Sequence, residues 1–435
     1  MTRTTSKRTY LDPIHHDITL NRNKPEERLI IELIDAPEFQ RLRRVQQLGI
    51  SFYTFQGAEG SRFTHSVGVM HVASRLLNML SETNSAVAEQ KAVALAAALL
   101  HDIGHGPFSH VTEKILGYDH EDWSCRIISG DTEVRSILDR HQAGSNLSEK
   151  IVRVLKKTYQ PKYVSHLISS QLDCDRFDYL LRDSYMTGTA YGLFALQRIL
   201  SSLEIDESGD RIIVVGEKGQ SAVEDYLFAR YSMYAQVYYH KKNLAVRALL
   251  SKLINRARYI AKTGDCFMDD ATRKWLMGEP LEVAEYLYLD DIQLTYHIKR
   301  WSRAGDPVLS DLASRFLTRR LFKAMRIPDG KPELAAEVEK QARKLASERG
   351  FDPDYYVATE STGFRPYDYY RPDSAVPQTN IMVRTETGVI RELSQLSLTI
   401  EALVKSENQA YWLVFPAEIT GELSQIKTLV PAASR

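Results

Sequence analysis

The feature that most constrains the fold is a helix with almost no polar face, expected from Ala88 to Ile103. Residues 92–100 are alanine, valine or leucine without exception, so this helix is expected to be buried on most of its sides. His101 and Asp102 stand at its C-terminal end, and glycines and a proline stop it directly afterwards. A carboxylate buried there is unfavourable unless a positive group meets it. The sequence therefore predicts a divalent cation at the end of this helix.

Histidine is crowded around that helix end. Of the 12 histidines, half lie in one stretch, at His65, His71, His101, His105, His110 and His120. Histidine is the commonest neutral metal ligand and the usual proton carrier near neutral pH. A preceding helix, expected from about Thr64 to Leu80, begins with His65, which can supply a third ligand. A mixed histidine and aspartate set suits Mn, Fe, Zn or Mg rather than a soft metal.

Further strings accompany this pattern from residue 12 to about residue 240. They are Asp12-Pro-Ile-His15, Pro37-Glu-Phe-Gln-Arg-Leu-Arg43, Gln47-Leu-Gly49, Arg62-Phe-Thr-His-Ser66, His101-Asp-Ile-Gly-His-Gly-Pro-Phe-Ser-His110, His120-Glu121, Asp175-Arg-Phe-Asp-Tyr-Leu-Leu-Arg-Asp183 and Arg230. With these strings the chain resembles the HD-domain superfamily, and within it the deoxynucleoside triphosphate (dNTP) triphosphohydrolases. Members of that branch cleave a dNTP into a deoxynucleoside and intact triphosphate. The resemblance implies this reaction, a divalent metal ion and a homo-oligomer, either a dimer or a tetramer.

The resemblance also assigns roles to individual residues. It implies that the metal ligands are His65, His101, Asp102 and Asp175. It implies that His105, His110 and His120 are catalytic and contact the phosphates. It implies a substrate-binding set, with Asp183 at the sugar 3′-hydroxyl, made of Gln47, Arg62, Arg176, Tyr179, Asp183, Arg230, Tyr234 and Tyr238.

These residue types suit the implied chemistry. A metal ion polarises the phosphate and lowers the pKa of the attacking water. Arginines stabilise the negative charge that builds on the phosphate oxygens, and His110 is the candidate general acid for the departing 5′-oxygen. Structural roles stay open, because a histidine can satisfy a helix end. Tyr234 and Tyr238 also have the helical spacing of core or interface residues.

A regulatory site is a separate hypothesis. In a vertebrate relative, the positions that match Asp35, Gln40 and Arg43 bind a guanine nucleotide at a subunit interface, and Arg8 aligns with a basic residue of that site. The resemblance thus implies GTP or a dNTP as an effector. The alternative is that Asp35 only caps the next helix, in a capping box with Glu38. The chain departs from the family pattern at His16, where glycine is common.

The expected fold class is mainly α, with an HD-domain helical core, a small β-hairpin and a C-terminal α+β module. Residues 1–326 are expected to form the phosphohydrolase core, in which 203–216 read as strand, turn and strand and helical patterning continues from 221 to about 261 and on to about 324. Residues 327–332 read as a linker. The C-terminal module, 327–435, is expected to regulate or assemble the protein. It contains a charged helix at 333–349, loops at 352–377, strands at 380–385 and 411–416, and a helix near 396–406.

Charge and cysteine content narrow the function further. The 56 basic and 56 acidic residues cancel, so no overall charge attracts nucleic acid or an anionic membrane. Three well-separated cysteines fit a reducing cytosol, and no secretory or membrane-spanning segment is expected, so we expect a cytoplasmic protein. Two alternatives to dNTP hydrolysis stay open. One is a phosphodiesterase, nucleotidase or nuclease with the same metal, and the other is a non-catalytic nucleotide-binding regulator.

Overall fold

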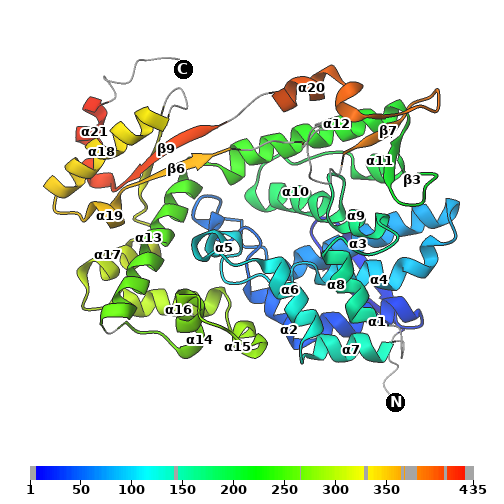
Figure 1. The fold of residues 1–435 in the computed structure, drawn as a ribbon, viewed down its shortest axis with the longest axis horizontal. Helices are drawn as coiled ribbons and strands as arrows, with labels where there is room; N and C mark the ends of the chain where they lie inside the picture. Colours follow the sequence, from blue (N-terminus) through cyan, green and yellow to red (C-terminus); the bar gives the residue numbers. More distant parts are fainter. Residues whose placement is uncertain are drawn as a thin grey trace.

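A computed structural model describes residues 6–141, 146–264, 266–327, 332–363, 367, 380–405 and 409–426. The chain is mainly helical and carries three small sheets, which confirms the expected fold class (Figure 1). No helix among these residues has the length and apolar character that crossing a bilayer requires.

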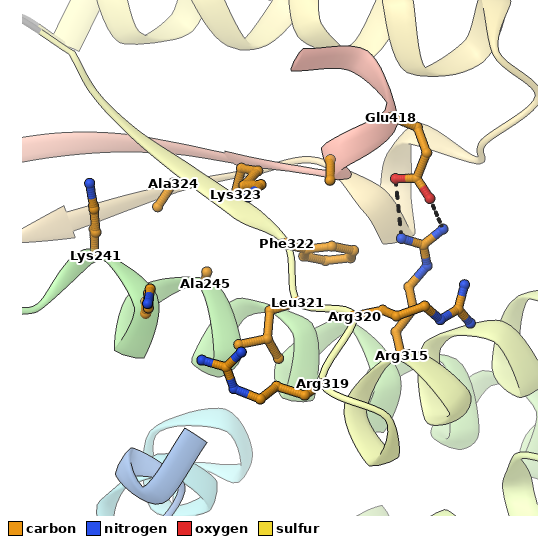
Figure 2. Close-up of a pocket in the computed structure, with 12 residues that line it drawn as sticks. Lys241, Ala245, Arg315, Arg319, Arg320, Leu321, Phe322, Lys323, Ala324 and Glu418 are labelled. Carbon is orange, nitrogen blue, oxygen red and sulfur yellow. Dashed lines mark hydrogen bonds and ion pairs between the residues drawn. The ribbon is translucent and has the colours of Figure 1, made fainter. Parts of the chain in front are cut away.

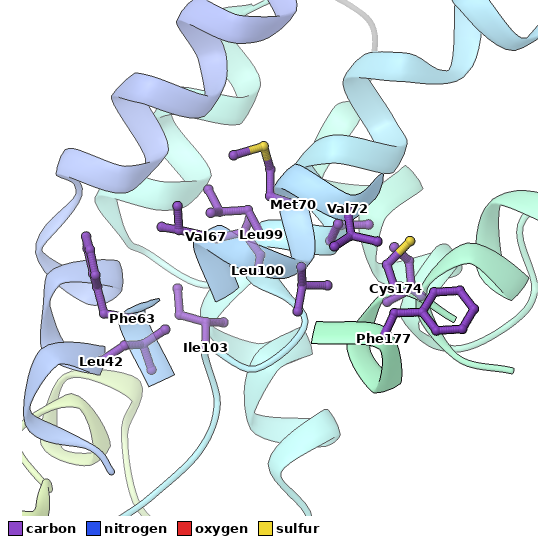
Figure 3. Packing of buried hydrophobic residues seen from close by; sticks show 14 of the residues in the cluster. Leu42, Phe63, Val67, Met70, Val72, Leu99, Leu100, Ile103, Cys174 and Phe177 are labelled. Atoms are coloured by element: carbon purple, nitrogen blue, oxygen red, sulfur yellow. The ribbon is translucent and has the colours of Figure 1, made fainter. Parts of the chain in front are cut away.

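Three helices form the centre of the core. They are α3 (Arg62–Thr83), α4 (Val87–Leu100) and α10 (Cys174–Thr187), and α3 packs against both of the others. Leu99 and Leu100 of α4 lie among Val67 and Met70 of α3 in a continuous apolar cluster (Figure 3). The outer sides of α4 are covered by α1 (Pro25–Asp35), α8 (Leu147–Leu155) and α9 (Tyr163–Ile168). The expected burial of this helix on most sides is confirmed.

The end of α4 is locked to the start of α6 (His120–Ser129). The Ser124 hydroxyl donates to the carbonyl of His101 and accepts from the N–H of Gly104, both at 2.9 Å. A Cβ on Gly104 would lie 2.2 Å from the His120 carbonyl oxygen and 2.2 Å from the Ser124 nitrogen, so only glycine fits. This contact brings His120 beside the metal-ligand candidates at the end of α4.

The region after α1 corrects one prediction. α2 (Pro37–Gln40) begins after Ala36, which has no side-chain cap, and continues into a 3₁₀ turn, Arg41–Arg44. Proline holds the residue before it in extended backbone, so the helix begins one residue later than the proposed cap. Asp35 is the last residue of α1 and pairs with Arg8, and Glu38 accepts the N–H of Glu133. The predicted capping box is wrong.

The hairpin of β3 (Leu203–Ile205) and β4 (Ile212–Val215) is confirmed. The edge of β4 that faces away from β3 pairs in parallel with β7 (Met382–Arg384). β7 in turn pairs with β8 (Ile390–Glu392). The C-terminal part of the chain thus completes a four-stranded sheet begun by the core. The helix predicted from 221 to 261 is interrupted, because α12 (Gly216–Met233) ends in a π-helical turn, Tyr234–Tyr238, before α13 (Lys241–Thr263) begins.

A second sheet has the order β5-β9-β6 and is antiparallel. It consists of β5 (Lys323–Ile327), β9 (Ala410–Phe415) and β6 (Ala358–Thr362), and α18 (Pro332–Glu348) packs on it through a small apolar cluster of its own. The predicted α18, β7, β9 and α20 (Leu398–Lys405) are confirmed. The prediction that helical structure continues to residue 324 is wrong at its end, because β5 begins at Lys323. The strand β6 lies where only loops were expected. Residues 328–331 of the expected linker lie outside the described residues, and the division at residue 327 stays a prediction.

The remaining elements surround this frame. The N-terminal hairpin is β1 (Lys7–Asp12) and β2 (His16–Asn21), paired antiparallel. The other helices are α5 (His110–Leu116), α7 (Glu133–His141), α11 (Leu196–Leu200), α14 (Asp270–Met277), α15 (Val283–Leu287), α16 (Asp291–Trp301), α17 (Pro307–Leu317), α19 (Pro353–Tyr356) and α21 (Thr420–Ile426).

We predict that Gly104→Ala destabilises the protein by about 1–3 kcal/mol, because the added methyl group pushes α6 away from the end of α4. The control is Gly305→Ala, where a Cβ would meet nothing within 4 Å. Urea unfolding followed by circular dichroism measures both variants. A Gly104→Ala protein as stable as the control would contradict the tight α4–α6 contact.

Candidate active site

The four predicted metal ligands converge from three helices. His65 comes from the first turn of α3, His101 and Asp102 follow α4, and Asp175 lies in the first turn of α10. The Nε2 atom of His65 lies 3.0 Å from Asp175 Oδ1 and 3.4 Å from Asp102 Oδ2. The Nε2 atom of His101 lies 3.3 Å from Asp102 Oδ1 and 3.6 Å from Asp175 Oδ1. Two ring nitrogens and two carboxylates therefore surround one point.

The hydrogen bonds of the two rings fit a cation at that point. His101 Nδ1 donates to the carbonyl of Ala98 at 2.8 Å, and His65 Nδ1 lies 2.8 Å from Asp178 Oδ2. A neutral ring that donates from Nδ1 carries a lone pair on Nε2. Both Nε2 atoms are buried and make no hydrogen bond, although the carboxylates face them. His65, His101 and Asp102 also meet the spacing of a metal-binding group. This donor set fits a divalent ion such as Mg, Mn, Fe or Zn.

The charges around this point keep its acids ionised. Burial alone would raise the pKa of Asp102, but Arg62, His101 and His105 outweigh it and hold that pKa well below its usual range. Burial would also raise the pKa of Asp175, but the hydrogen bonds and charges of His101 and His65 outweigh this effect. The pKa of Asp175 is therefore lowered as well. Arg62 reaches Asp102 with Nη1 and the Ser109 hydroxyl with Nε, the latter at 2.8 Å. The site thus presents two carboxylates at neutral pH.

A second cluster lies next to the first. The rings of His105 and His120 stack with centroids 3.8 Å apart, and the His110 ring lies edge-on to both. Glu113, which sequence reasoning missed, lies 2.7 Å from Nδ1 of His110 with one oxygen and 2.7 Å from Nδ1 of His120 with the other. His105 Nε2 lies 3.4 Å from Asp102 Oδ1, which links the two clusters. The three predicted catalytic histidines are therefore together.

The two histidines bonded to Glu113 differ in the direction of their pKa shifts. Burial lowers the pKa of His120, but the bond to Glu113 and the charge of Asp102 outweigh it, so the pKa is raised. For His110 desolvation dominates and lowers the pKa, despite its bond to Glu113. In both rings the carboxylate holds Nδ1, which leaves Nε2 as the atom that can exchange a proton with a substrate.

A cavity of about 460 Å³ opens beside these clusters. Nine of the predicted residues line it: Gln47, Arg62, His110, Asp175, Arg176, Tyr179, Asp183, Tyr234 and Tyr238. Lys114 and Arg247, which sequence reasoning did not select, line it too. The π-helical turn carries Tyr234 and Tyr238 to its wall. Arg230 does not line the cavity, and its Nη1 donates to the Gln171 side chain at 2.8 Å.

Asp183 is the unusual group of this cavity. The Tyr238 hydroxyl donates to its Oδ2 at 2.8 Å, while its Oδ1 is buried and makes no hydrogen bond. Burial raises the pKa of Asp183 to about 7, although the bond from Tyr238 works in the opposite direction. An unpartnered acceptor at this position can receive a hydroxyl group of a ligand.

The candidate regulatory residues form a contiguous group elsewhere. Arg8 pairs with Asp35. Gln40 donates to the carbonyl of Ile34, the residue before Asp35, at 2.6 Å, and it accepts from Arg43 Nε at 2.8 Å. The Arg43 guanidinium lies 3.6 Å from the centre of the Phe63 ring. His16 has φ 59°, the left-handed conformation that favours glycine, so the backbone keeps the conformation expected of a glycine there.

A second cavity, of about 560 Å³, lies between α13, α17 and the β5-β9-β6 sheet (Figure 2). Glu418 is the one carboxylate among the described residues that line it, and it is paired with Arg315. The other charged groups that line it are all basic: Lys241, Lys242, Arg319, Arg320 and Lys323. An anion fits this charge distribution.

Comparison with known proteins identifies the family of this chain. The HD domain family matches residues 62–183, and the HD associated region matches residues 194–415. The uncharacterized protein YwfO of Bacillus subtilis is 38% identical over 95% of this chain and 93% of its own length. The chain belongs to the HD-domain family. The matched HD domain begins at Arg62 and ends at Asp183, so it contains all four candidate metal ligands and the histidine cluster.

Two further similarities bear on the reaction. A crystal structure of a phosphohydrolase from Bacteroides thetaiotaomicron matches 94% of this chain and 99% of its own, with a TM-score of 0.78 and 27% identity. The human deoxynucleoside triphosphate triphosphohydrolase SAMHD1 is 26% identical over 58% of this chain, which spans 45% of the length of that enzyme. The family and the histidine–aspartate donor set together indicate a metal-dependent phosphohydrolase.

We predict that Asp183→Asn stabilises the protein at pH 8 and has little effect near pH 4. Ionisation of the Asp183 carboxyl is unfavourable in the folded state. The resulting loss in the free energy of unfolding grows as the pH rises from about 4, and it is complete above the folded pKa of about 7. Its upper bound is about 4 kcal/mol, and asparagine avoids it. Urea unfolding at pH 4 and pH 8 measures this, with the exposed Asp122→Asn as control. Equal differences at both pH values would contradict the assignment.

Proposed function

We propose that this protein hydrolyses deoxynucleoside triphosphates to deoxynucleosides and inorganic triphosphate. The observation that carries the proposal is one continuous cavity with two unlike ends. Arg62, His110 and Asp175 line it beside the metal-ligand cluster, and Asp183 and Tyr238 line it with a free buried acceptor. A nucleotide has the same two ends, because its phosphates are anionic and its sugar offers a hydroxyl donor.

The residues of the chain divide the work along the cavity. A bound divalent ion would polarise a phosphate oxygen and supply a water of lowered pKa. Arg62, Arg176 and Lys114 line the cavity and offset the charge of the triphosphate. The unpartnered Oδ1 of Asp183 accepts the sugar 3′-hydroxyl. Tyr179 and Tyr238 meet edge to face, with ring centroids 6.3 Å apart, and close the sugar end against water.

His110 is the proposed general acid for the departing 5′-oxygen. It is a cavity-lining residue, and Glu113 holds its Nδ1 so that Nε2 faces away from the carboxylate. Its pKa is lowered by desolvation, but the negative charge of a bound triphosphate raises the pKa of a neighbouring histidine. His120, on the same carboxylate, has a raised pKa and supplies a further positive charge toward the phosphates.

We predict that His110→Ala retains its metal content and loses about 10²–10⁴-fold in kcat, because the leaving oxygen no longer receives a proton. The measurement is chromatographic detection of deoxynucleoside and triphosphate after incubation with each dNTP under Mg²⁺ or Mn²⁺. His141→Ala, at the end of α7, is the control. An unchanged kcat would remove His110 from the mechanism.

The same incubation separates the alternatives. A phosphodiesterase, nucleotidase or nuclease with this metal centre would release a nucleotide, pyrophosphate or orthophosphate, and free triphosphate would be absent. A non-catalytic regulator would bind the nucleotide and metal and release no product. The proposal requires the deoxynucleoside and triphosphate in equal amounts.

We also propose that a nucleotide such as GTP or a dNTP regulates the enzyme and that the protein is a homo-oligomer. The group of Arg8, Asp35, Gln40 and Arg43 supports the first idea, since it combines exposed cations with hydrogen-bonding groups. The basic cavity around Lys323 offers a second place for phosphates (Figure 2). The resemblance to SAMHD1 supports the oligomer.

We predict that GTP or dGTP stimulates hydrolysis of dATP and that Lys323→Glu weakens this stimulation while basal activity is retained. The substitution places a carboxylate in the basic cavity, where it repels a triphosphate. The measurement is the rate against effector concentration, with the oligomer size followed by light scattering. A hydrolysis rate and an oligomer size that stay unchanged when GTP or dGTP is added would refute regulation.

A further inference from the structure

The turn between β1 and β2 lies beside the metal centre, although the proposed reaction makes no use of it. His15 Nε2 lies 2.7 Å from Asp178 Oδ1, and the two side chains are 2% and 0% exposed. Asp12 accepts from Arg182 Nη1 at 2.8 Å and also holds the turn, because its Oδ1 accepts the N–H groups of Ile14 and His15, each at 2.9 Å. The Asp12-Pro-Ile-His15 string therefore has a buried structural role.

Asp178 is the centre of this network. Its Oδ2 bonds His65 Nδ1 at 2.8 Å and Arg182 Nε at 2.8 Å, and its Oδ1 bonds His15 and Arg182 Nη2, the latter at 2.9 Å. Both oxygens are thus held by groups from three parts of the chain. A carboxylate with this number of donors has a fixed orientation and stays charged despite full burial.

Gly68 leaves the space that this network occupies. A Cβ at this position of α3 would lie 2.0 Å from Asp178 Oδ1 and 2.8 Å from its Cγ. The missing side chain allows the carboxylate of α10 to lie against the backbone of α3, one turn after His65. The packing of these two helices is therefore built around the Asp178 side chain.

We propose that Asp178 is the positioning residue of the metal centre and that His15 and Arg182 hold it in place. Its bond to Nδ1 keeps the proton on that nitrogen, so the Nε2 lone pair of His65 faces Asp102 and Asp175. The N-terminal hairpin is then part of the metal site, although it contributes no ligand. This inference goes beyond the proposed function, because it concerns metal affinity and is independent of the substrate.

The test is calorimetric titration of Mn²⁺ into chelator-stripped full-length protein, below the melting temperature of every variant. Asp178→Asn replaces one oxygen by an NH₂ group that opposes a donor, and His15→Ala removes only the contact from the hairpin. We expect the dissociation constant to rise about 10–100-fold for Asp178→Asn. His15→Ala should produce a smaller rise, and His15→Gln, whose amide can donate to Asp178, should recover most of it.

The control is His71→Ala. The His71 ring lies tilted against the His15 ring, with centroids 5.3 Å apart, so its removal disturbs packing and leaves the bond from His15 to Asp178 in place. A purely structural role would lower the melting temperature of His15→Ala without a change in the Mn²⁺ affinity of the folded protein. Wild-type affinity in His15→Ala would overturn the role of the hairpin even where Asp178→Asn fails to fold. Equal losses in His71→Ala and His15→Ala would also overturn it. Because metal binding is measured directly, failure to hydrolyse dNTPs would leave this result unaffected.

Discussion

The structure depends on the way three acidic side chains are kept ionised inside an apolar helix bundle. Asp102, Asp175 and Asp178 meet His65, and Asp12 meets the Arg182 that supports Asp178. A buried carboxylate without a positive partner is strongly unfavourable. Every helix that contributes to this centre therefore brings a compensating donor, and α3, α4 and α10 pack in an arrangement that joins the acids to their partners. Stability and metal affinity are set by the same contacts.

The two ends of the cavity differ in whether their carboxylates have positively charged partners. Near the metal centre, carboxylates are matched by arginine and histidine and remain charged. Among the described residues no cation bonds Asp183, a tyrosine is its hydrogen-bond donor, and its pKa rises to about 7. One end is suited to phosphate and metal, and the other to a neutral hydroxyl group. In the proposed reaction, the local supply of positive charge, more than the shape of the cavity, determines which part of the nucleotide each end receives.

Much of this site was predictable, because its parts lie where helices begin or end. His101 and Asp102 follow an apolar helix that glycines stop, His65 begins the helix before it, and Asp175 came from the resemblance to the HD-domain superfamily. Glu113 and Asp178 were not predicted, since each lies inside an ordinary helical pattern. Glu113 gains its role from two histidines nearby in the sequence, and Asp178 gains its role from histidines far away in the sequence. The role of Arg41 was not predicted either, and this side chain is buried against the carbonyls of His105 and Leu289. β5 reads as the end of a helix because its strand partner β9 follows far along the chain.

The parallel pairing of β4 with β7 has a consequence for synthesis of the protein. Val214 and Val383 are partners, yet helices α12 to α19 lie between them in the sequence. When the segment with the HD motifs leaves the ribosome, one edge of its hairpin is still open, and it stays open until residues near 384 have emerged. During that interval the nascent chain exposes backbone groups that the finished protein conceals.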